Sequence, residues 1–138
     1  MTRLEITFLA LVGVQAVHSV EEYLGRLWVV FPPAAFVTGL ISQDRQFVFI
    51  LINVALLVFG LWCFFWPVHR RWAVARAFIG VWIVIEVING IGHPLWTLQQ
   101  RAYTPGVATA PVLLVLALSL LWQLKKSSAG SSKNEEES

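Results

Sequence analysis

The stretch that decides the fold is LEITFLALVGVQAVHSVEEYL, residues 4–24. It is mostly apolar and long enough to cross, as a helix, the roughly 30 Å hydrocarbon core of a bilayer. Near its end it carries a histidine followed by two carboxylates, His18-Ser19-Val20-Glu21-Glu22. Ionisable side chains at membrane depth are costly, and they are retained mainly where they face a bundle interior and act chemically. This stretch therefore predicts a membrane-spanning helix that carries part of a functional site.

The composition of the whole chain is also that of a membrane protein. Of its 138 residues, 57% are hydrophobic and 13% are charged, whereas soluble domains carry about a quarter charged residues. The net charge of +2 and the absence of a basic patch with interleaved aromatic residues exclude nucleic acid as a partner. The single cysteine, Cys63, excludes an internal disulfide and a cysteine-based metal site.

Four apolar stretches are long enough to span a bilayer. They run roughly over Leu4–Leu24, Phe47–Trp66, Trp72–Trp96 and Val107–Leu124. Pro67 ends the second stretch, and Pro111 lies near the start of the fourth, where proline is tolerated. We therefore expect an all-α fold, a four-helix transmembrane bundle over residues 1–126. A polar tail over residues 127–138 should be disordered.

A further apolar segment, LWVVFPPAAFVTGLI, lies between the first and second spans at residues 27–41. It is short, and Pro32 and Pro33 interrupt it. We predict an interfacial or re-entrant segment that caps the bundle. A fifth span is the weaker alternative, because two prolines in the middle of the run would disrupt a helix.

The distribution of lysine and arginine predicts the orientation, because these residues concentrate on the cytoplasmic side. One side of the expected bundle carries Arg3, Arg70, Arg71, Arg76, Lys125, Lys126 and Lys133. The other side carries Arg26, Arg45 and Arg101. We therefore expect an integral protein of the cell membrane with both termini in the cytoplasm.

Polar residues from three spans are predicted to meet at one depth near the outer leaflet. They are His18, Glu21 and Glu22 in the first span, Asn53 in the second, and Glu86, Asn89 and His93 in the third. At 1.5 Å per residue, their positions fall within about 10 Å of one depth. The sequence therefore predicts a single polar site inside the bundle.

Helical periodicity indicates which side chains face this site. Gln15, His18 and Glu22 share one face of the first span, and Trp82, Glu86, Asn89 and His93 share one face of the third. Gly90 lies beside the second face, and Gly90 and Gly92 would let a backbone or a ligand approach closely. Pro94 follows His93, so we expect the third helix to kink or end there.

Three kinds of chemistry fit these residues. His18, Glu22, Glu86 and His93 form the donor set of a divalent zinc or iron site, in which Glu21 would orient a ligand or move protons. In a site without a metal or other cofactor, Glu22 and Glu86 would act as acid and base. The third reading is a hydrogen-bond network that only fixes helix packing.

Three motifs in order resemble the HXXEE domain family: His18-x-x-Glu21-Glu22, the later His93, and Tyr103-Thr104-Pro105-Gly106. The resemblance covers nearly the whole chain from the first span to the fourth, and nothing in the sequence departs from the family pattern. It implies an integral membrane domain and gives weight to these positions. The family has no assigned activity, so the resemblance implies no reaction.

The segment Tyr103–Gly106 falls in the outer loop, directly above the polar cluster. Pro105 and Gly106 suit a tight turn, and Tyr103 could lower its hydroxyl into the site as a catalytic group. We predict a small metal-dependent membrane enzyme that acts on a membrane lipid or another apolar small molecule. The alternatives are a metal-free isomerase or cyclase, a non-enzymatic binder of metal or lipid, and a transport or proton-relay subunit, which with four spans would have to be an oligomer if it transports. No oligomeric state follows from the sequence.

Overall fold

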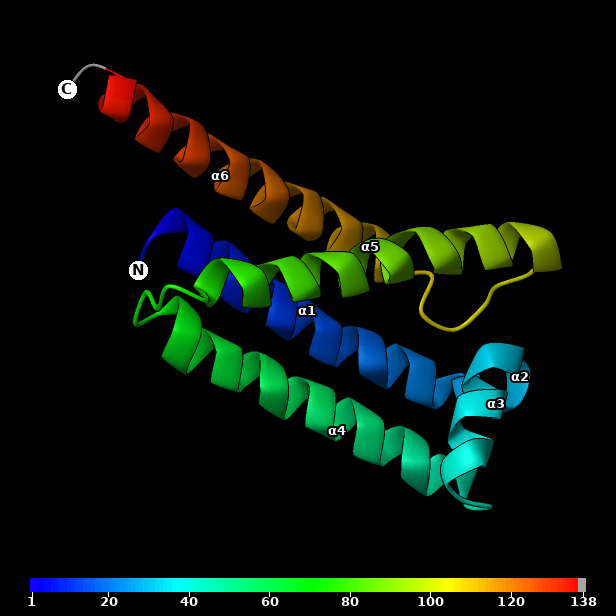
Figure 1. The fold of residues 1–138 in the computed structure, drawn as a ribbon. Helices are drawn as coiled ribbons and strands as arrows, with labels where there is room; N and C mark the ends of the chain where they lie inside the picture. Colours follow the sequence, from blue (N-terminus) through cyan, green and yellow to red (C-terminus); the bar gives the residue numbers. More distant parts are fainter. Residues whose placement is uncertain (137–138) are drawn as a thin grey trace.

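The computed structural model describes the backbone of residues 1–136 and the side chains of residues 1–127. The described residues form helices and turns, without a strand, which confirms the all-α prediction. The elements in Figure 1 are α1 (Arg3–Leu24), α2 (Leu27–Val30), α3 (Pro32–Ile41), α4 (Arg45–Cys63), the π-helical turn η1 (Phe64–Val68), α5 (Ala75–Gln100) and α6 (Ala110–Glu136).

Four helices are long and apolar enough to cross a membrane: α1, α4 with η1, α5, and α6 as far as Ser127. The bundle is apolar on the outside and partly polar inside. Large hydrophobic side chains such as Leu24, Val58, Ile88 and Val115 are exposed on the four helices, whereas several carboxylates and imidazoles are buried. This inverted polarity fits a bundle surrounded by lipid, because a water-soluble chain rarely exposes large apolar surfaces.

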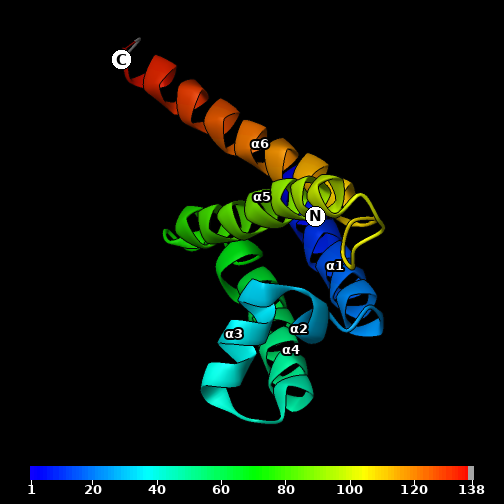
Figure 2. The same ribbon diagram turned by 90° about the vertical axis from the view of Figure 1, so that its right-hand side faces the viewer.

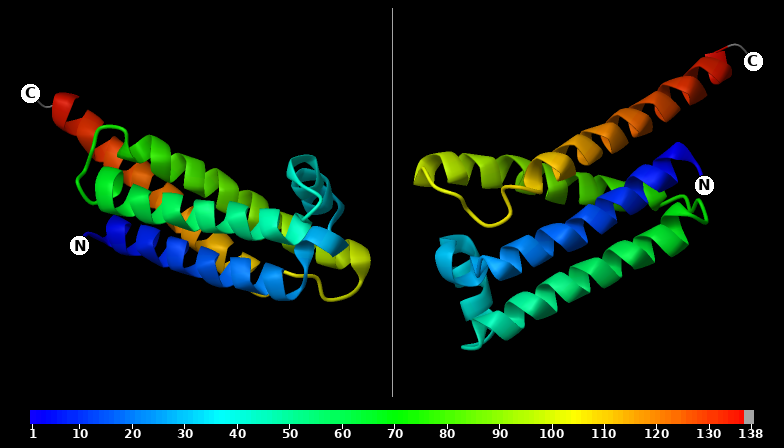
Figure 3. Two further views of the ribbon diagram at one scale, coloured as in Figure 1. Left: turned by 90° about the horizontal axis from the view of Figure 1, so that it is seen from below. Right: turned by 180° about the vertical axis from the view of Figure 1, so that it is seen from behind.

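The two ends of the bundle differ in what they carry. The N-terminus, the last described turns of α6 and the connection between α4 and α5 lie at one end, called the terminal end here (Figure 1). The short helices α2 and α3 and the loop 101–109 lie at the other end, the motif end (Figures 1 and 2). Helix α1 packs against α4 and α6, and α5 packs against α6 (Figure 3). The fold therefore gathers α2, α3 and the loop around the motif end of α1.

Side-chain caps fix where two of the long helices begin. Thr2 and Glu5 form a reciprocal capping box at the start of α1, since each side chain bonds the other residue's backbone N–H. Asp44 accepts a hydrogen bond from the backbone N–H of Phe47 at the start of α4, as its sequence position predicts.

The apolar core occupies the terminal half of the bundle. Trp82 of α5 is fully buried there and lies edge-on to Phe8 of α1, with ring centroids 6.2 Å apart. A Cβ atom at Gly60 would lie 2.8 Å from the Trp82 ring, so only glycine lets α4 approach this indole. A Cβ at Gly90 would lie 2.5 Å from Cβ of Leu114, which confirms the predicted close approach at Gly90, but no described neighbour lies within 4 Å of a Cβ at Gly92, so the predicted close approach of a backbone at Gly92 is wrong.

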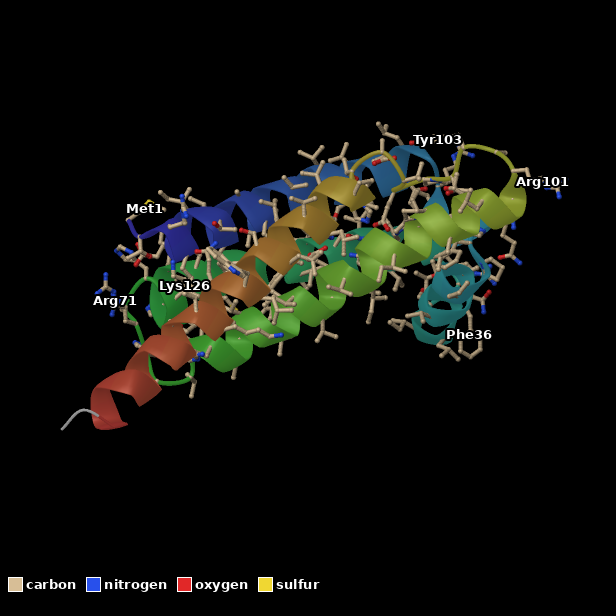
Figure 4. The ribbon with its side chains drawn as sticks, turned by 90° about the horizontal axis from the view of Figure 1, so that it is seen from above. Met1, Phe36, Arg71, Arg101, Tyr103 and Lys126 are labelled. Carbon is tan, nitrogen blue, oxygen red and sulfur yellow. The ribbon has the colours of Figure 1, made fainter. Side chains whose placement is uncertain are left out.

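The predicted segment between the first two spans is present as two short helices. Pro32 and Pro33 do not break a helix but begin one, because they occupy the first positions of α3. Proline suits these positions, where a backbone N–H would have no intrahelical partner. Figure 4 shows Phe36 on the outer side of α3, directed away from the long helices.

Two helix ends differ from the predictions at prolines. At Pro94, where a kink or an end was expected, α5 does not end but continues to Gln100, and Arg101 then adopts a left-handed conformation. The second span, expected to stop at Pro67, passes it by one residue, since η1 carries it to Val68. Proline removes one backbone donor but keeps a helical φ angle. In η1 the backbone N–H of His69 donates to Phe64, five residues earlier, so the wider turn accommodates the ring.

The backbone of α6 is helical to Glu136. Residues 137–138 lie outside the described residues, and the disorder of the tail from residue 127 stays a prediction.

Candidate metal centre

Two histidines and one carboxylate meet inside the motif end of the bundle. Glu22 Oε1 lies 3.3 Å from His18 Nε2 and 3.1 Å from His93 Nε2. The two imidazole rings are almost perpendicular, with centroids 4.8 Å apart. All three side chains are buried, and one ligand atom from each lies within 4.8 Å of the others. The chain therefore brings together three metal-ligating groups from two helices.

The spacing of these residues explains their convergence. His18 and Glu22 are four residues apart on α1, so their side chains lie one turn apart on the same face. His93 comes from α5, which the close crossing at Gly90 holds against α6. Because α6 also packs on α1, the imidazole of His93 reaches the carboxylate of Glu22.

The Nδ1 atom of His93 has a hydrogen-bond partner that fixes the position of the ring proton. His93 Nδ1 lies 2.7 Å from the backbone carbonyl oxygen of Pro105. A carbonyl only accepts hydrogen bonds, so Nδ1 is the donor. In the neutral ring Nε2 then carries a lone pair, and this lone pair faces Glu22.

Thr109 fixes the proton of His18 on Nδ1 in a similar way. Thr109 Oγ1 lies 2.7 Å from a carboxylate oxygen of Glu21 and 2.7 Å from His18 Nδ1. The hydroxyl has one proton, which it donates to the carboxylate, so Oγ1 accepts from His18 Nδ1–H. His18 Nε2 is therefore also left with a lone pair that faces Glu22.

The centre consequently holds three acceptor atoms with no donor between them when both rings are neutral. His18 Nε2 is fully buried and makes no hydrogen bond to the described residues, because its contact with Glu22 lacks hydrogen-bond geometry. Such a group is stable with a cation among its atoms, which is a metal ion or additional protons. Two ligands about 2.1 Å from a tetrahedral zinc ion lie roughly 3.4 Å apart. The two contacts with Glu22, at 3.1 and 3.3 Å, fit this spacing, and the three ligand atoms all lie within 4.8 Å of one another.

Glu21 anchors the loop 101–109 to α1. Its two oxygens accept hydrogen bonds from the Tyr103 hydroxyl (2.6 Å), from Ala108 N (3.0 Å), and from Thr109 N (3.1 Å) as well as Thr109 Oγ1. The hydrogen bond to this carboxylate raises the pKa of Tyr103 to about 12, so the hydroxyl keeps its proton as a donor. The Tyr103 side chain is 67% exposed and binds Glu21 at the outer edge of the centre (Figure 4).

Gly106 covers the two imidazoles at a distance that no other residue allows. Its φ angle is +90°, a conformation that L side chains rarely adopt. A Cβ atom here would lie 2.5 Å from His93 Cε1 and 2.9 Å from His18 Cε1. The preceding Pro105 packs against Gly25, where a Cβ would collide with the proline ring. The loop therefore closes over the centre with its backbone.

The residues that form this centre lie within a region matched by one family model. The model is described as a protein of unknown function with HXXEE motif, and it matches residues 9–121. The chain belongs to the HXXEE family. The match extends from α1 into α6 and includes the motif His18–Glu22 and His93, which confirms the predicted family. No curated protein and no solved structure matches the chain.

The two glutamates of the HXXEE motif have different environments. Glu22 faces the imidazoles, whereas Glu21 binds the loop and reaches His18 only through Thr109. Sequence reasoning singled out Tyr103, Pro105 and Gly106 but missed Thr109. The only sequence signal for Thr109 is its place in the loop, three residues after Gly106 and directly before α6.

Glu86, predicted as a fourth ligand, lies in a separate hydrogen-bonded cluster. It is fully buried and accepts a hydrogen bond from Asn89 Nδ2 at 3.3 Å. The side-chain amide of Gln15 lies between it and Ser19: one end is 3.1 and 3.2 Å from the two oxygens of Glu86, and the other is 3.3 Å from Ser19 Oγ. Ser19 in turn lies 2.6 Å from Asn53 Oδ1.

Amide groups, not imidazoles, surround the carboxyl group of Glu86. The amino end of Gln15 donates to both Glu86 oxygens, at 3.1 and 3.2 Å, and Asn89 Nδ2 donates to one of them. Asn53 uses its amino group on the Phe49 carbonyl, so Ser19 donates its one proton to Asn53 Oδ1. The cluster therefore holds Glu86 by amide donors from α1 and α5.

A cavity of about 340 Å³ adjoins the centre and this cluster. It lies where α4 and α5 diverge toward the motif end (Figure 1). Its polar lining includes Glu22, His93, Gln15, Asn53 and Asn89, and its apolar lining is Leu27, Phe31, Pro33, Ala34, Val37, Phe49, Ile52, Leu56 and Ile85. Of the other predicted pocket residues, Trp82 lies in the apolar core and Gly90 at the crossing of α5 and α6.

Proposed function

We propose that this HXXEE protein is a membrane-embedded, metal-dependent enzyme. One observation carries the proposal: the Nε2 atoms of His18 and His93 converge on Glu22 Oε1 while their Nδ1 atoms are held as donors. Metal-binding histidines commonly donate their second N–H to a carboxylate or carbonyl group, which fixes the ring for its ligand role.

Two imidazoles and one carboxylate suit zinc or ferrous iron. A catalytic zinc site uses three protein ligands and leaves a position for water, and two histidines with one carboxylate also hold iron in oxygenases. The ion would supply an activated water or a place for oxygen. The protein would supply the orientation of the rings, through Thr109 and the Pro105 carbonyl, and a loop that excludes water.

The adjoining cavity supports an apolar substrate. Its mostly aliphatic and aromatic lining and its volume resemble those of small-molecule sites. Val37 and Ile52 line it and are also exposed on the outer surface of the bundle. We propose that a lipid or another apolar molecule enters from the bilayer beside α3 and presents its polar group to Glu22 and the ion.

Metal analysis of the purified protein tests the ion. The change His18→Ala with His93→Ala should reduce bound zinc or iron to background while helix content holds. His69→Ala is the matched control, because this third histidine is 55% exposed at the terminal end and should leave the metal content unchanged. Equal metal content in all three proteins would overturn the proposal.

Chelating probes with alkyl chains test the cavity. Long-chain alkyl hydroxamates should bind the metal-loaded protein more tightly than short ones, because their chains would fill the apolar cavity. Ala34→Phe places a ring in the cavity and should abolish this preference. Ala55→Phe is the control, since Ala55 is exposed on α4 outside the cavity lining. An unchanged preference in Ala34→Phe would contradict the entry of substrate through this cavity.

A metal-free acid–base enzyme is the second candidate. The 3.1 Å contact of Glu22 with His93 Nε2 also fits a hydrogen bond from a protonated ring. Glu22 would then exchange protons with a substrate in the cavity, as in an isomerase or cyclase. Nitrogen NMR of labelled histidines separates the two: coordination predicts rings protonated only at Nδ1, whereas the metal-free candidate predicts doubly protonated rings in a preparation without metal.

The orientation is part of the proposal. With both termini in the cytoplasm, the motif end faces the outside of the cell. A cysteine introduced by Ala102→Cys in the exposed loop should react with an impermeant reagent in intact cells, while the native Cys63 is buried and should not. Reaction only after permeabilisation would reverse the orientation.

A further inference from the structure

The terminal end carries a second cavity, far from the metal centre. It has a volume of about 350 Å³ and lies between the start of α1 and the last described turns of α6. Its lining is Thr2, Arg3, Leu4, Trp122, Gln123, Lys126 and Ser127. Figure 4 shows Met1 and Lys126 at the same end of the molecule. This cavity plays no part in the chemistry proposed above.

The charged side chains that line this cavity are both positive. Arg3 and Lys126 are its only charged lining residues, and neither forms an ion pair with a carboxylate among residues 1–127. Arg76 lies next to them, because its guanidinium donates to Ser127 Oγ and to the Leu124 carbonyl. The nearby carboxylate of Glu5 is buried and accepts a hydrogen bond from the backbone N–H of Thr2. Among residues 1–127, Arg3 and Lys126 therefore face the cavity without a paired carboxylate, and hydroxyl and amide groups lie beside them.

The position of the cations matches the depth of lipid headgroups. Arg3 is the first residue of the candidate span α1, and Lys126 is one residue from the end of the candidate span in α6. Below them the cavity is lined by Leu4 and by the half-exposed indole of Trp122, over which the Lys126 ammonium lies 5.3 Å from the ring centroid. Cations above an aromatic ring and an aliphatic side chain form a surface that can bind both the phosphate and the upper acyl chain of a phospholipid.

We propose that this cavity binds the headgroup of an anionic phospholipid. The phosphate would lie between Arg3 and Lys126, with Thr2, Gln123 and Ser127 within reach of further lipid oxygens, and the acyl chains would follow Leu4 and Trp122 along the groove between α1 and α6. A bound lipid would hold the two helix ends together at the terminal end. The proposal is independent of whether the metal centre binds an ion.

Native mass spectrometry of the detergent-purified chain tests this site. Phosphatidylglycerol and phosphatidylcholine with the same acyl chains are titrated separately. The chain should retain one phosphatidylglycerol with an affinity on the order of tenfold above that for phosphatidylcholine, because each basic residue near the phosphate favours the anionic lipid. Arg3→Gln with Lys126→Gln should abolish this preference.

Arg70→Gln with Arg71→Gln is the charge-matched control. Both residues lie at the terminal end but outside the cavity, so this variant should keep the preference. Inorganic phosphate should not displace the lipid at equal concentration. Three results would overturn the proposal: equal retention of the two lipids, an equal loss in the control variant, or displacement by phosphate, which would indicate a site for free anions. Melting temperatures of both variants close to that of the parent protein exclude misfolding as the cause.

Discussion

Replacement of Thr109 by valine should weaken metal binding without dismantling the loop. Valine keeps the shape of the side chain but lacks Oγ1, which lies 2.7 Å from both His18 Nδ1 and Glu21. Glu21 would still accept hydrogen bonds from the Tyr103 hydroxyl and from two backbone N–H groups, so the loop should remain attached to α1. The change therefore isolates the link between Glu21 and the imidazole.

The magnitude follows from the lost contacts. A buried donor left without a partner costs about 1–3 kcal/mol, and His18 Nδ1–H would become such a donor. Loss of a hydrogen bond behind a metal ligand typically lowers metal affinity 10–100-fold, or about 1.4–2.7 kcal/mol. We expect a decrease in this range for zinc or iron.

Competition with a chromophoric chelator at neutral pH measures the affinity, and Thr109→Ser is the control because serine restores the hydroxyl. The reasoning predicts that the serine variant keeps an affinity within a few-fold of the parent protein. An unchanged affinity in the valine variant, or an equal loss in both variants, would refute the role of Thr109 in orienting His18.

Three further predictions concern single residues. Gly106→Ala should abolish metal binding, because its Cβ would collide with both imidazoles. Gly80→Ala is the control and should keep the metal, because a Cβ there would meet no neighbour within 4 Å among the described residues. Metal retained in Gly106→Ala would contradict the closed loop. Glu86→Gln should keep the metal content, because the group that could hold an ion is His18, Glu22 and His93. Loss of metal in this variant would restore Glu86 as a ligand. The pKa of Tyr103 is raised from 10 to about 12, so its hydrogen bond to Glu21 stabilises the fold fully below pH 10 and is lost as the pH rises toward 12. Ultraviolet titration should show a transition near pH 12 that is absent in Tyr103→Phe. A transition that persists in this variant would contradict the hydrogen bond.

The membrane-capable helices were predictable from sequence because a bilayer imposes length and apolarity on every span. The ends of the helices were less predictable. Pro94 and Pro67 lie inside helical segments, because the packing of neighbouring elements and a wider turn compensate for a missing donor. A proline in a sequence shows a lost hydrogen bond but not whether the surrounding helices compensate for it.

The sequence predicted the centre in part, because its imidazoles and carboxylates are rare inside apolar spans and were expected at one depth. His18, Glu22 and His93 stand out because imidazoles and carboxylates are unusual inside apolar spans. Glu86 shares a helix face with His93, yet its carboxyl pairs with Gln15 and Asn89. That choice depends on how α1 and α5 are placed relative to each other, which periodicity within one helix does not determine. Thr109 was missed because a loop threonine has no distinguishing pattern until its partners are known.

X-ray absorption at the edge of the bound metal tests the central claim most directly. The account predicts an ion in the purified protein coordinated by two imidazole nitrogens about 2.0–2.1 Å away and by carboxylate or water oxygen, with one imidazole contribution lost in His18→Ala and one in His93→Ala. A protein that carries no ion under metal-replete conditions, or a spectrum that neither variant changes, would contradict it.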